Sequence, residues 1–110
     1  MSPFAYLMVA IVSEVIATSS LRLSDGFSKL VPSIVVVFGY VIAFYMLSQA
    51  LKGMKIGEAY AIWSGIGTAG IAIVGLVIFH EPLNAWSIVG IVLIVAGVLV
   101  INLLGGVSHA

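Results

Sequence analysis

Residues 4–21 read FAYLMVAIVSEVIATSSL. The stretch is apolar apart from small hydroxyl side chains and one acidic residue, Glu14, near its middle. At a rise of about 1.5 Å per residue, a helix of this length crosses a hydrocarbon core of roughly 30 Å. A carboxylate at that depth costs about 2.5–3.5 kcal/mol on insertion scales, so it is rarely kept without a use. The stretch therefore predicts a membrane helix whose Glu14 holds a proton, binds a cation, or exchanges one for the other.

Three further apolar segments follow, at residues 32–51, 59–79 and 85–104, and none of them contains Asp, Glu, Lys, Arg or His. The chain is 63% hydrophobic and 7% charged, whereas about a quarter of the residues of a soluble domain are charged. The short connections force neighbouring helices to run antiparallel. We expect a single all-α integral membrane domain over residues 1–110, a four-helix bundle with spans at about 4–21, 32–51, 59–79 and 85–104. We also expect the first span to be retained, because no basic signal-peptide region precedes it.

The composition also excludes several classes of function. The formal net charge is zero, so binding to nucleic acid has no electrostatic support. There is no cysteine for a disulfide or a thiolate metal site. No nucleophile–base pair is visible, and the isolated His80 and His109 do not make a metal site. We therefore expect neither enzymatic activity nor a cofactor. We expect the remaining charged side chains, Arg22 and Glu81 among them, to be solvated in loops.

The charges in the loops give no clear orientation. Arg22 and Lys29 lie on one side of the predicted membrane domain, and Lys52 and Lys55 lie on the other. Because basic residues favour the cytoplasmic side, an even distribution permits insertion in both orientations. The alternative is that the balance is chance in a chain with four basic residues.

A bundle this small predicts a need for a second copy. Four helices packed on one another leave room for only a water or an ion, so a chamber for an organic molecule needs another chain. The last span offers a seam for it, because Gly90, Leu93 and Gly97 recur at spacings of three and four. Small residues let helices approach closely in lipid.

Helical spacing gathers polar and aromatic side chains near Glu14. The candidates for binding a substrate are Leu7, Ala10, Ile11 and Thr18 of the first span, Tyr40 and Phe44 of the second, and Tyr60, Trp63 and Ser64 of the third. Aromatic faces attract cations, Trp most strongly, so the group predicts a receptor for a hydrophobic cation. The alternative is an ordinary packing stripe or an interfacial belt. Gly65 and Gly67 in the third span serve either as a hinge or as a site of close helix packing.

Several stretches together resemble one known family. They are GEAYAIWSG at residues 57–65, SEV at 13–15, SDGF at 24–27 and AGVLVIN at 96–102. Over essentially its whole length the chain resembles the small multidrug resistance family. The resemblance implies proton-coupled export of cationic drugs across a bacterial cell membrane by an antiparallel homodimer. It also implies that Glu14 binds both protons and substrate, that Tyr40, Tyr60 and Trp63 line the chamber, that Gly65–Gly67 form a kink, and that Gly90–Gly97 form the dimer seam.

Two positions indicate a branch within this family. Guanidinium exporters of the family usually carry Trp where this chain has Ala17, and Met where it has Tyr40, so the chain resembles the quaternary-ammonium and multidrug branch. Phe4, Ala43 and Glu58 depart from that branch, and residues 81–83 are closer to the guanidinium branch. The alternatives are a guanidinium exporter of the same fold, or a non-transporting membrane subunit that requires a paired chain.

Overall fold

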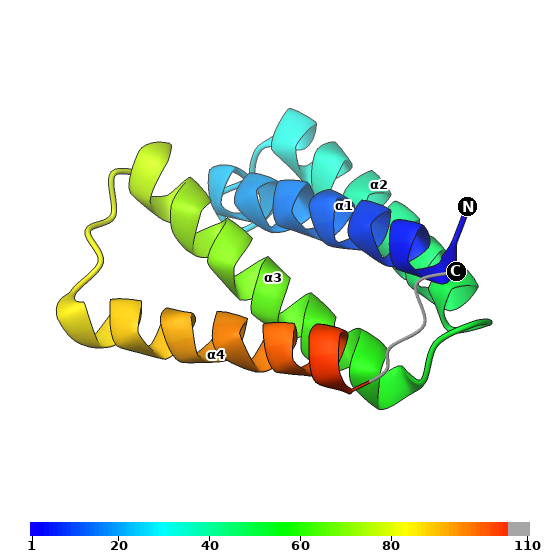
Figure 1. Cartoon of the computed structure of the whole chain (residues 1–110). Helices are drawn as coiled ribbons and strands as arrows, with labels where there is room; N and C mark the ends of the chain where they lie inside the picture. Colours follow the sequence, from blue (N-terminus) through cyan, green and yellow to red (C-terminus); the bar gives the residue numbers. More distant parts are fainter. Residues whose placement is uncertain (106–110) are drawn as a thin grey trace.

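The computed structural model describes residues 1–105, so His109 lies outside the described residues. This part of the chain forms four helices: α1 (Pro3–Leu23), α2 (Leu30–Ala50), α3 (Ile56–Val77) and α4 (Ala85–Leu104) (Figure 1). All four are long and apolar enough to cross a membrane. The predicted number and order of the spans are thus confirmed, and the bounds of the last span agree to the residue.

The other helix ends differ from the prediction by one to three residues, for local reasons. α1 continues to Leu23 because nothing interrupts it before Asp25, which adopts a positive φ together with Gly26 and Phe27. α2 begins two residues before Pro32. A proline in the first helical turn removes only an N–H that has no intrahelical acceptor, so it does not define the first residue.

α3 ends earlier than predicted, at Val77, because the chain turns away there. His80 adopts a positive φ, and the backbone N–H of Glu81 donates to the carbonyl oxygen of Gly75 at 2.9 Å. The connection of residues 78–84 is therefore tied back onto the last turn of α3. At its far end Asn84 caps α4, because its side chain accepts a hydrogen bond from the Ser87 N–H at 2.8 Å.

The helices pack in the order α2, α1, α3, α4, and α4 has substantial contact only with α3. The Cα positions span 43 × 35 × 17 Å, which describes a flat molecule. Figure 1 shows α3 and α4 meeting near the start of α3 and moving apart toward the 78–84 connection. The four helices agree with the predicted bundle, but the single chain is more open than four helices packed tightly on one another. Lipid is as apolar as a neighbouring helix, so the uniformly apolar α4 gains little by packing onto the other helices.

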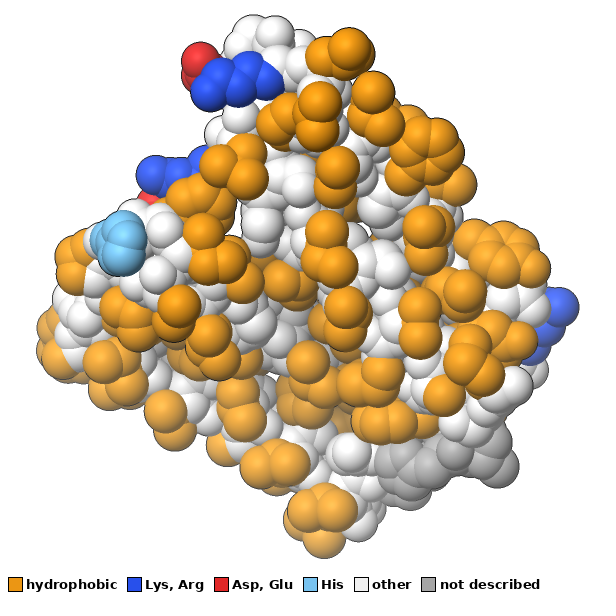
Figure 2. Space-filling model, turned by 90° about the horizontal axis from the view of Figure 1, so that it is seen from above, with side chains coloured by type: hydrophobic (Ala, Val, Ile, Leu, Met, Phe, Trp, Pro, Cys, Tyr) orange, Lys and Arg blue, Asp and Glu red, His pale blue; other side chains and the backbone are white. Residues whose placement is uncertain are grey.

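Buried apolar side chains concentrate in the N-terminal halves of α1 and α3. Leu7 and Ile11 of α1 pack with Ile62 of α3 and Val98 of α4, and all four are at most 8% exposed. Many of the large apolar side chains outside this cluster are exposed. Figure 2 shows them spread across one face, with Lys and Arg side chains at its edges.

Glycines permit the two closest helix crossings. A Cβ atom on Gly39 of α2 would lie 2.7 Å from the Cβ atom of Ala17 on α1. A Cβ atom on Gly65 of α3 would come even closer to a methyl group of Val98 on α4. Gly65 therefore supports the close packing of α4 on α3.

A matched pair of substitutions on α3 tests this crossing. Gly65→Ala forces a methyl group into Val98 and should destabilise the fold by about 1–3 kcal/mol, as overpacking does. Gly57→Ala, on the same helix, meets no atom within 4 Å and should be neutral or slightly stabilising. Unfolding of both variants in detergent measures the difference, and equal stabilities would contradict the close crossing.

Candidate functional site

Glu14 opens into a recess on the side of the molecule where α1 meets α3. This Glu14 recess has a volume of about 470 Å³ and is lined by Glu14, Tyr60, Trp63, Ser64, Gly67, Thr68, Ile71 and Ala72. A second hollow of about 200 Å³, the aromatic recess, adjoins it and is lined by Glu14, Tyr40, Phe44, Leu47, Tyr60, Trp63 and Ser64. Glu14, Tyr60, Trp63 and Ser64 line both. The carboxylate therefore stands between two adjoining hollows.

Hydrogen bonds connect the Glu14 carboxylate to α2. The Thr18 hydroxyl donates to Glu14 Oε1 at 2.8 Å, and the Thr18 hydroxyl oxygen lies 2.6 Å from the Tyr40 hydroxyl oxygen. A threonine hydroxyl has one proton to donate. When that proton points to Glu14, Tyr40 must be the donor to Thr18. The result is a chain of hydrogen bonds from Tyr40 through Thr18 to Glu14, which satisfies part of the carboxylate inside the membrane domain.

Gly67 lets the carboxylate approach the Trp63 ring. A Cβ atom on Gly67 would lie 3.8 Å from Glu14 Oε2 and 3.4 Å from Cδ1 of Trp63. The Glu14 carboxylate and the Trp63 ring thus both lie beside Gly67, which is buried. A methyl group at this position would make ordinary van der Waals contact with both the acid and the indole.

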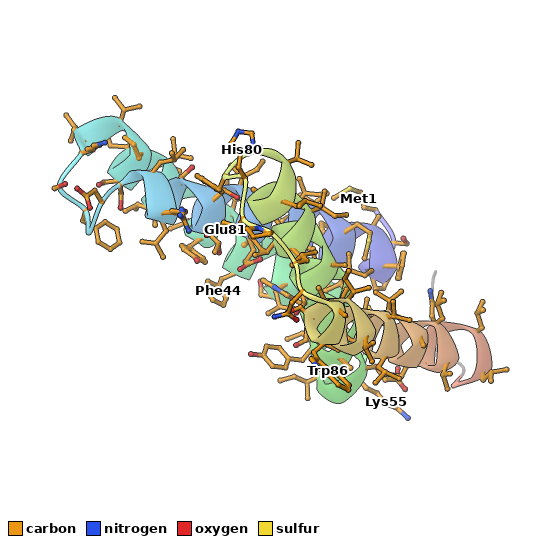
Figure 3. The ribbon with its side chains drawn as sticks, turned by 90° about the vertical axis from the view of Figure 1, so that its left-hand side faces the viewer. Met1, Phe44, Lys55, His80, Glu81 and Trp86 are labelled. Atoms are coloured by element: carbon orange, nitrogen blue, oxygen red, sulfur yellow. The ribbon has the colours of Figure 1, made fainter. Side chains whose placement is uncertain are left out.

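Aromatic rings continue the site from α3 to α2. The Phe44 ring lies 6.2 Å from the Trp63 ring and 6.4 Å from the Tyr40 ring, centroid to centroid, within the range of favourable aromatic pairs. Tyr60 and Phe44 are 65% and 60% exposed, and Phe44 projects outward from α2 (Figure 3). A cation held here would meet one carboxylate and several ring faces, and it would be open on the remaining side.

Four of the residues predicted to bind substrate, Leu7, Ala10, Ile11 and Thr18, do not line either hollow. Leu7, Ala10 and Ile11 share the predicted stripe with Glu14, but they are 0%, 0% and 3% exposed and are buried within the chain. Thr18 reaches the site through its hydrogen bond to the carboxylate rather than by lining these hollows. A contact between the three buried residues and a substrate stays a prediction that this arrangement does not favour.

Sequence reasoning missed four lining residues: Leu47 on α2, and Thr68, Ile71 and Ala72 on α3. The last three follow Ser64 at i+4, i+7 and i+8, so extending the α3 stripe by two turns identifies them. Leu47 continues the α2 stripe of Tyr40 and Phe44 in the same way.

The predicted hinge and seam residues lie in different surroundings. α3 is continuous from Ile56 to Val77, so bending at Gly65 and Gly67 stays a prediction. No other part of the described chain comes within 4 Å of a Cβ atom built on Gly90 or Gly97, and Leu93 is 67% exposed. The predicted seam is therefore an open face of α4.

Comparison with known proteins places this site in a family. The model for the Small Multidrug Resistance protein family matches residues 2–94. The chain belongs to the small multidrug resistance family. It is 51% identical to the quaternary ammonium compound-resistance protein QacE of Escherichia coli over 108 residues, which cover 98% of each chain. It is 46% identical to the multidrug resistance protein EbrA of Bacillus licheniformis over 100 residues, which cover 91% of this chain and 95% of the relative.

A multidrug transporter of Pseudomonas aeruginosa is 44% identical over 108 residues, again with 98% of each chain covered. The family resemblance seen in the sequence is thereby confirmed. With four apolar helices and bacterial relatives, this member of the family is a multi-pass protein of the bacterial inner membrane. Its relatives are multidrug resistance transporters, and the protein is not an enzyme.

The two tryptophans provide a direct test of the site. Trp63 lines both hollows, whereas Trp86 is 83% exposed at the start of α4. Tetraphenylphosphonium should change the fluorescence of a Trp86→Phe variant as it does that of the unmodified protein. Trp63→Phe should lose the change and bind the cation about three- to tenfold more weakly, because the indole is the better cation–π partner. Retention of signal and affinity by Trp63→Phe would remove Trp63 from the site.

Proposed function

We propose that this family member is a proton-coupled antiporter that exports hydrophobic, aromatic and quaternary-ammonium cations by alternating access. The observation that carries the proposal is the position of Glu14. It is the one carboxylate lining the Glu14 recess and the aromatic recess, and the rings of Tyr60 and Trp63 line both recesses with it. A carboxylate and ring faces together complement a positive charge on a greasy molecule.

The α1–α2 crossing supports the multidrug branch over the guanidinium branch. Ala17 is fully buried, and α2 passes so close that a Cβ atom on Gly39 would lie 2.7 Å from the Ala17 methyl group. A tryptophan at position 17 would not fit without moving α2. The names of QacE and EbrA, which refer to quaternary ammonium compounds and to multiple drugs, agree with this choice.

Protons and cations would compete for the same carboxylate. A drug cation is attracted by the ionised form of Glu14. Proton binding removes the charge and so releases the drug. The hydrogen bond from Thr18 to Glu14 would then reverse, because a protonated carboxyl group can itself donate.

A second copy of the chain would complete the chamber. The Glu14 recess is open on one side, and the face of α4 that carries Gly90, Leu93 and Gly97 is uncovered. An antiparallel homodimer would use that face and place two Glu14 carboxylates around one chamber, where they would bind protons as a coupled pair. Exchange of two protons for one monovalent cation would move net charge and gain about 2.3 kcal/mol per 100 mV of membrane potential.

Glu14→Gln tests the coupling. The amide binds no proton and attracts no cation, so proton-driven uptake of tetraphenylphosphonium into proteoliposomes should be abolished. In the unmodified protein, affinity for the cation should fall as the pH falls, by up to about tenfold per pH unit for each proton displaced. Asp25→Asn is the matched control, because Asp25 is exposed in the loop between α1 and α2. Normal coupled uptake by Glu14→Gln would refute the proposal.

Cysteine cross-linking tests the dimer, since the chain has no cysteine of its own. In an antiparallel pair of α4 helices that cross near Leu93, position 90 of one copy lies near position 97 of the other. A mixture of Gly90→Cys and Gly97→Cys chains should therefore form a mixed disulfide more readily than either variant alone. Preferential cross-linking of Gly90→Cys to itself would indicate a parallel dimer.

A further inference from the structure

A polar contact joins the ends of α1 and α3 at one face of the membrane domain. Arg22, in the last turn of α1, donates a hydrogen bond to and forms an ion pair with the Glu81 carboxylate in the 78–84 connection. The Arg22 guanidinium carbon also lies 4.9 Å from the centre of the Phe79 ring, a cation–π distance. The expectation that both charged groups are merely solvated in loops is wrong: Arg22 is helical, and the two are paired.

Glu81 is fixed to α3 by more than this pair. Its backbone N–H donates to the Gly75 carbonyl oxygen, and its carboxylate lies over Gly75, where a Cβ atom would be 2.9 Å from Oε1. In Figure 3, Glu81 lies near the ribbon of α1, whereas the neighbouring His80 lies at the outer edge of the molecule. Arg22 and Glu81 therefore link α1 to the end of α3 rather than to a free loop.

This contact lies beyond one end of the Glu14 recess, between α1 and α3. Glu14, Thr18 and Arg22 follow one another at i, i+4 and i+8, on one face of α1. A small hollow of about 160 Å³, the end recess, is lined by Thr18, Ser19, Arg22, Ile71, Val74, Gly75, Phe79 and Glu81. It shares Ile71 with the Glu14 recess. The ion pair thus borders the space between Glu14 and the membrane face formed by the 24–29 and 78–84 connections.

The two ends of the α1–α3 contact are held by different forces. Buried apolar side chains, Leu7, Ile11 and Ile62 among them, fix the N-terminal end. At the other end the side chains of Arg22 and Glu81 are 57% and 48% exposed. An exposed ion pair is weak and can be replaced by water. The C-terminal end of the contact can therefore separate while the N-terminal end stays packed.

We propose that the Arg22–Glu81 pair is a latch that closes the Glu14 recess toward this membrane face and must open for a cation to pass. The inference rests on the proposed function, because it assigns this end of each chain a role in alternating access. In an antiparallel dimer the latches of the two copies lie at opposite membrane faces. A latch closed in one copy and open in the other gives access from one side only.

Cysteine labelling in lipid nanodiscs tests the latch without using transport. Ile71→Cys places one thiol between the end recess and the Glu14 recess, in a chain with no other cysteine. In that background, Arg22→Glu and Glu81→Arg each replace attraction by repulsion. Each should raise the rate of labelling by a charged, membrane-impermeant thiol reagent by about two- to tenfold. The double variant restores the pair in reverse and should label within about twofold of the Ile71→Cys background.

Lys29→Glu is the matched control, because Lys29 lies at the same membrane face and forms no salt bridge within residues 1–105. It should leave the labelling rate unchanged. Gly75→Val provides a second disruption, since it displaces the Glu81 carboxylate while both charges stay, and it should also speed labelling. Unchanged labelling in the single variants, or a double variant that labels as fast as the singles, would overturn the latch. Failure of the proposed function itself would appear elsewhere, as binding of tetraphenylphosphonium that does not depend on pH.

Discussion

The structure depends on accommodating one carboxylate inside a membrane domain. Glu14 would be costly in hydrocarbon, and the surrounding chain supplies what it lacks. Thr18, one turn along, donates a hydrogen bond to it, and Tyr40 extends that chain to α2. Gly67 on α3 leaves room for the acid beside Trp63. Three helices thus converge on a single acidic group, the one to which the proposed function assigns proton and cation binding.

Small residues decide how close the helices come at two crossings of the described chain. The Gly39–Ala17 and Gly65–Val98 crossings are tight, whereas most of α4 has no neighbour in the described chain. A flat chain with an open recess and an uncovered apolar face agrees with the proposal that a second copy completes the chamber. The energetics agree, because between apolar helices in lipid association depends on close packing rather than on the hydrophobic effect. The Arg22–Glu81 pair adds a polar contact at the C-terminal end of the α1–α3 contact, where apolar packing is weak.

Helical periodicity recovered much of the site but not its edges. Glu14, Tyr40, Phe44, Tyr60, Trp63 and Ser64 were predicted from spacing and lie together. Leu7, Ala10 and Ile11 have the same spacing, yet neighbouring helices cover them. Residues on one face of a helix can contact different neighbours. Their spacing in the sequence does not show which of them another helix will cover. The pairing of Arg22 with Glu81 had no sequence signal, because 59 residues separate them.

By itself the sequence determined the class of protein, the number and order of the apolar helices, and the acidic residue on which the proposed function rests. Hydropathy and the cost of a charge in lipid are properties of local segments, so they can be read without a fold. Only the tertiary structure decided that the single chain is a flat, open array, that Gly65 faces α4 while Gly67 faces Glu14, and that Arg22 pairs with Glu81. Those features depend on the rotation and crossing of whole helices, which are set by contacts between segments far apart in the chain.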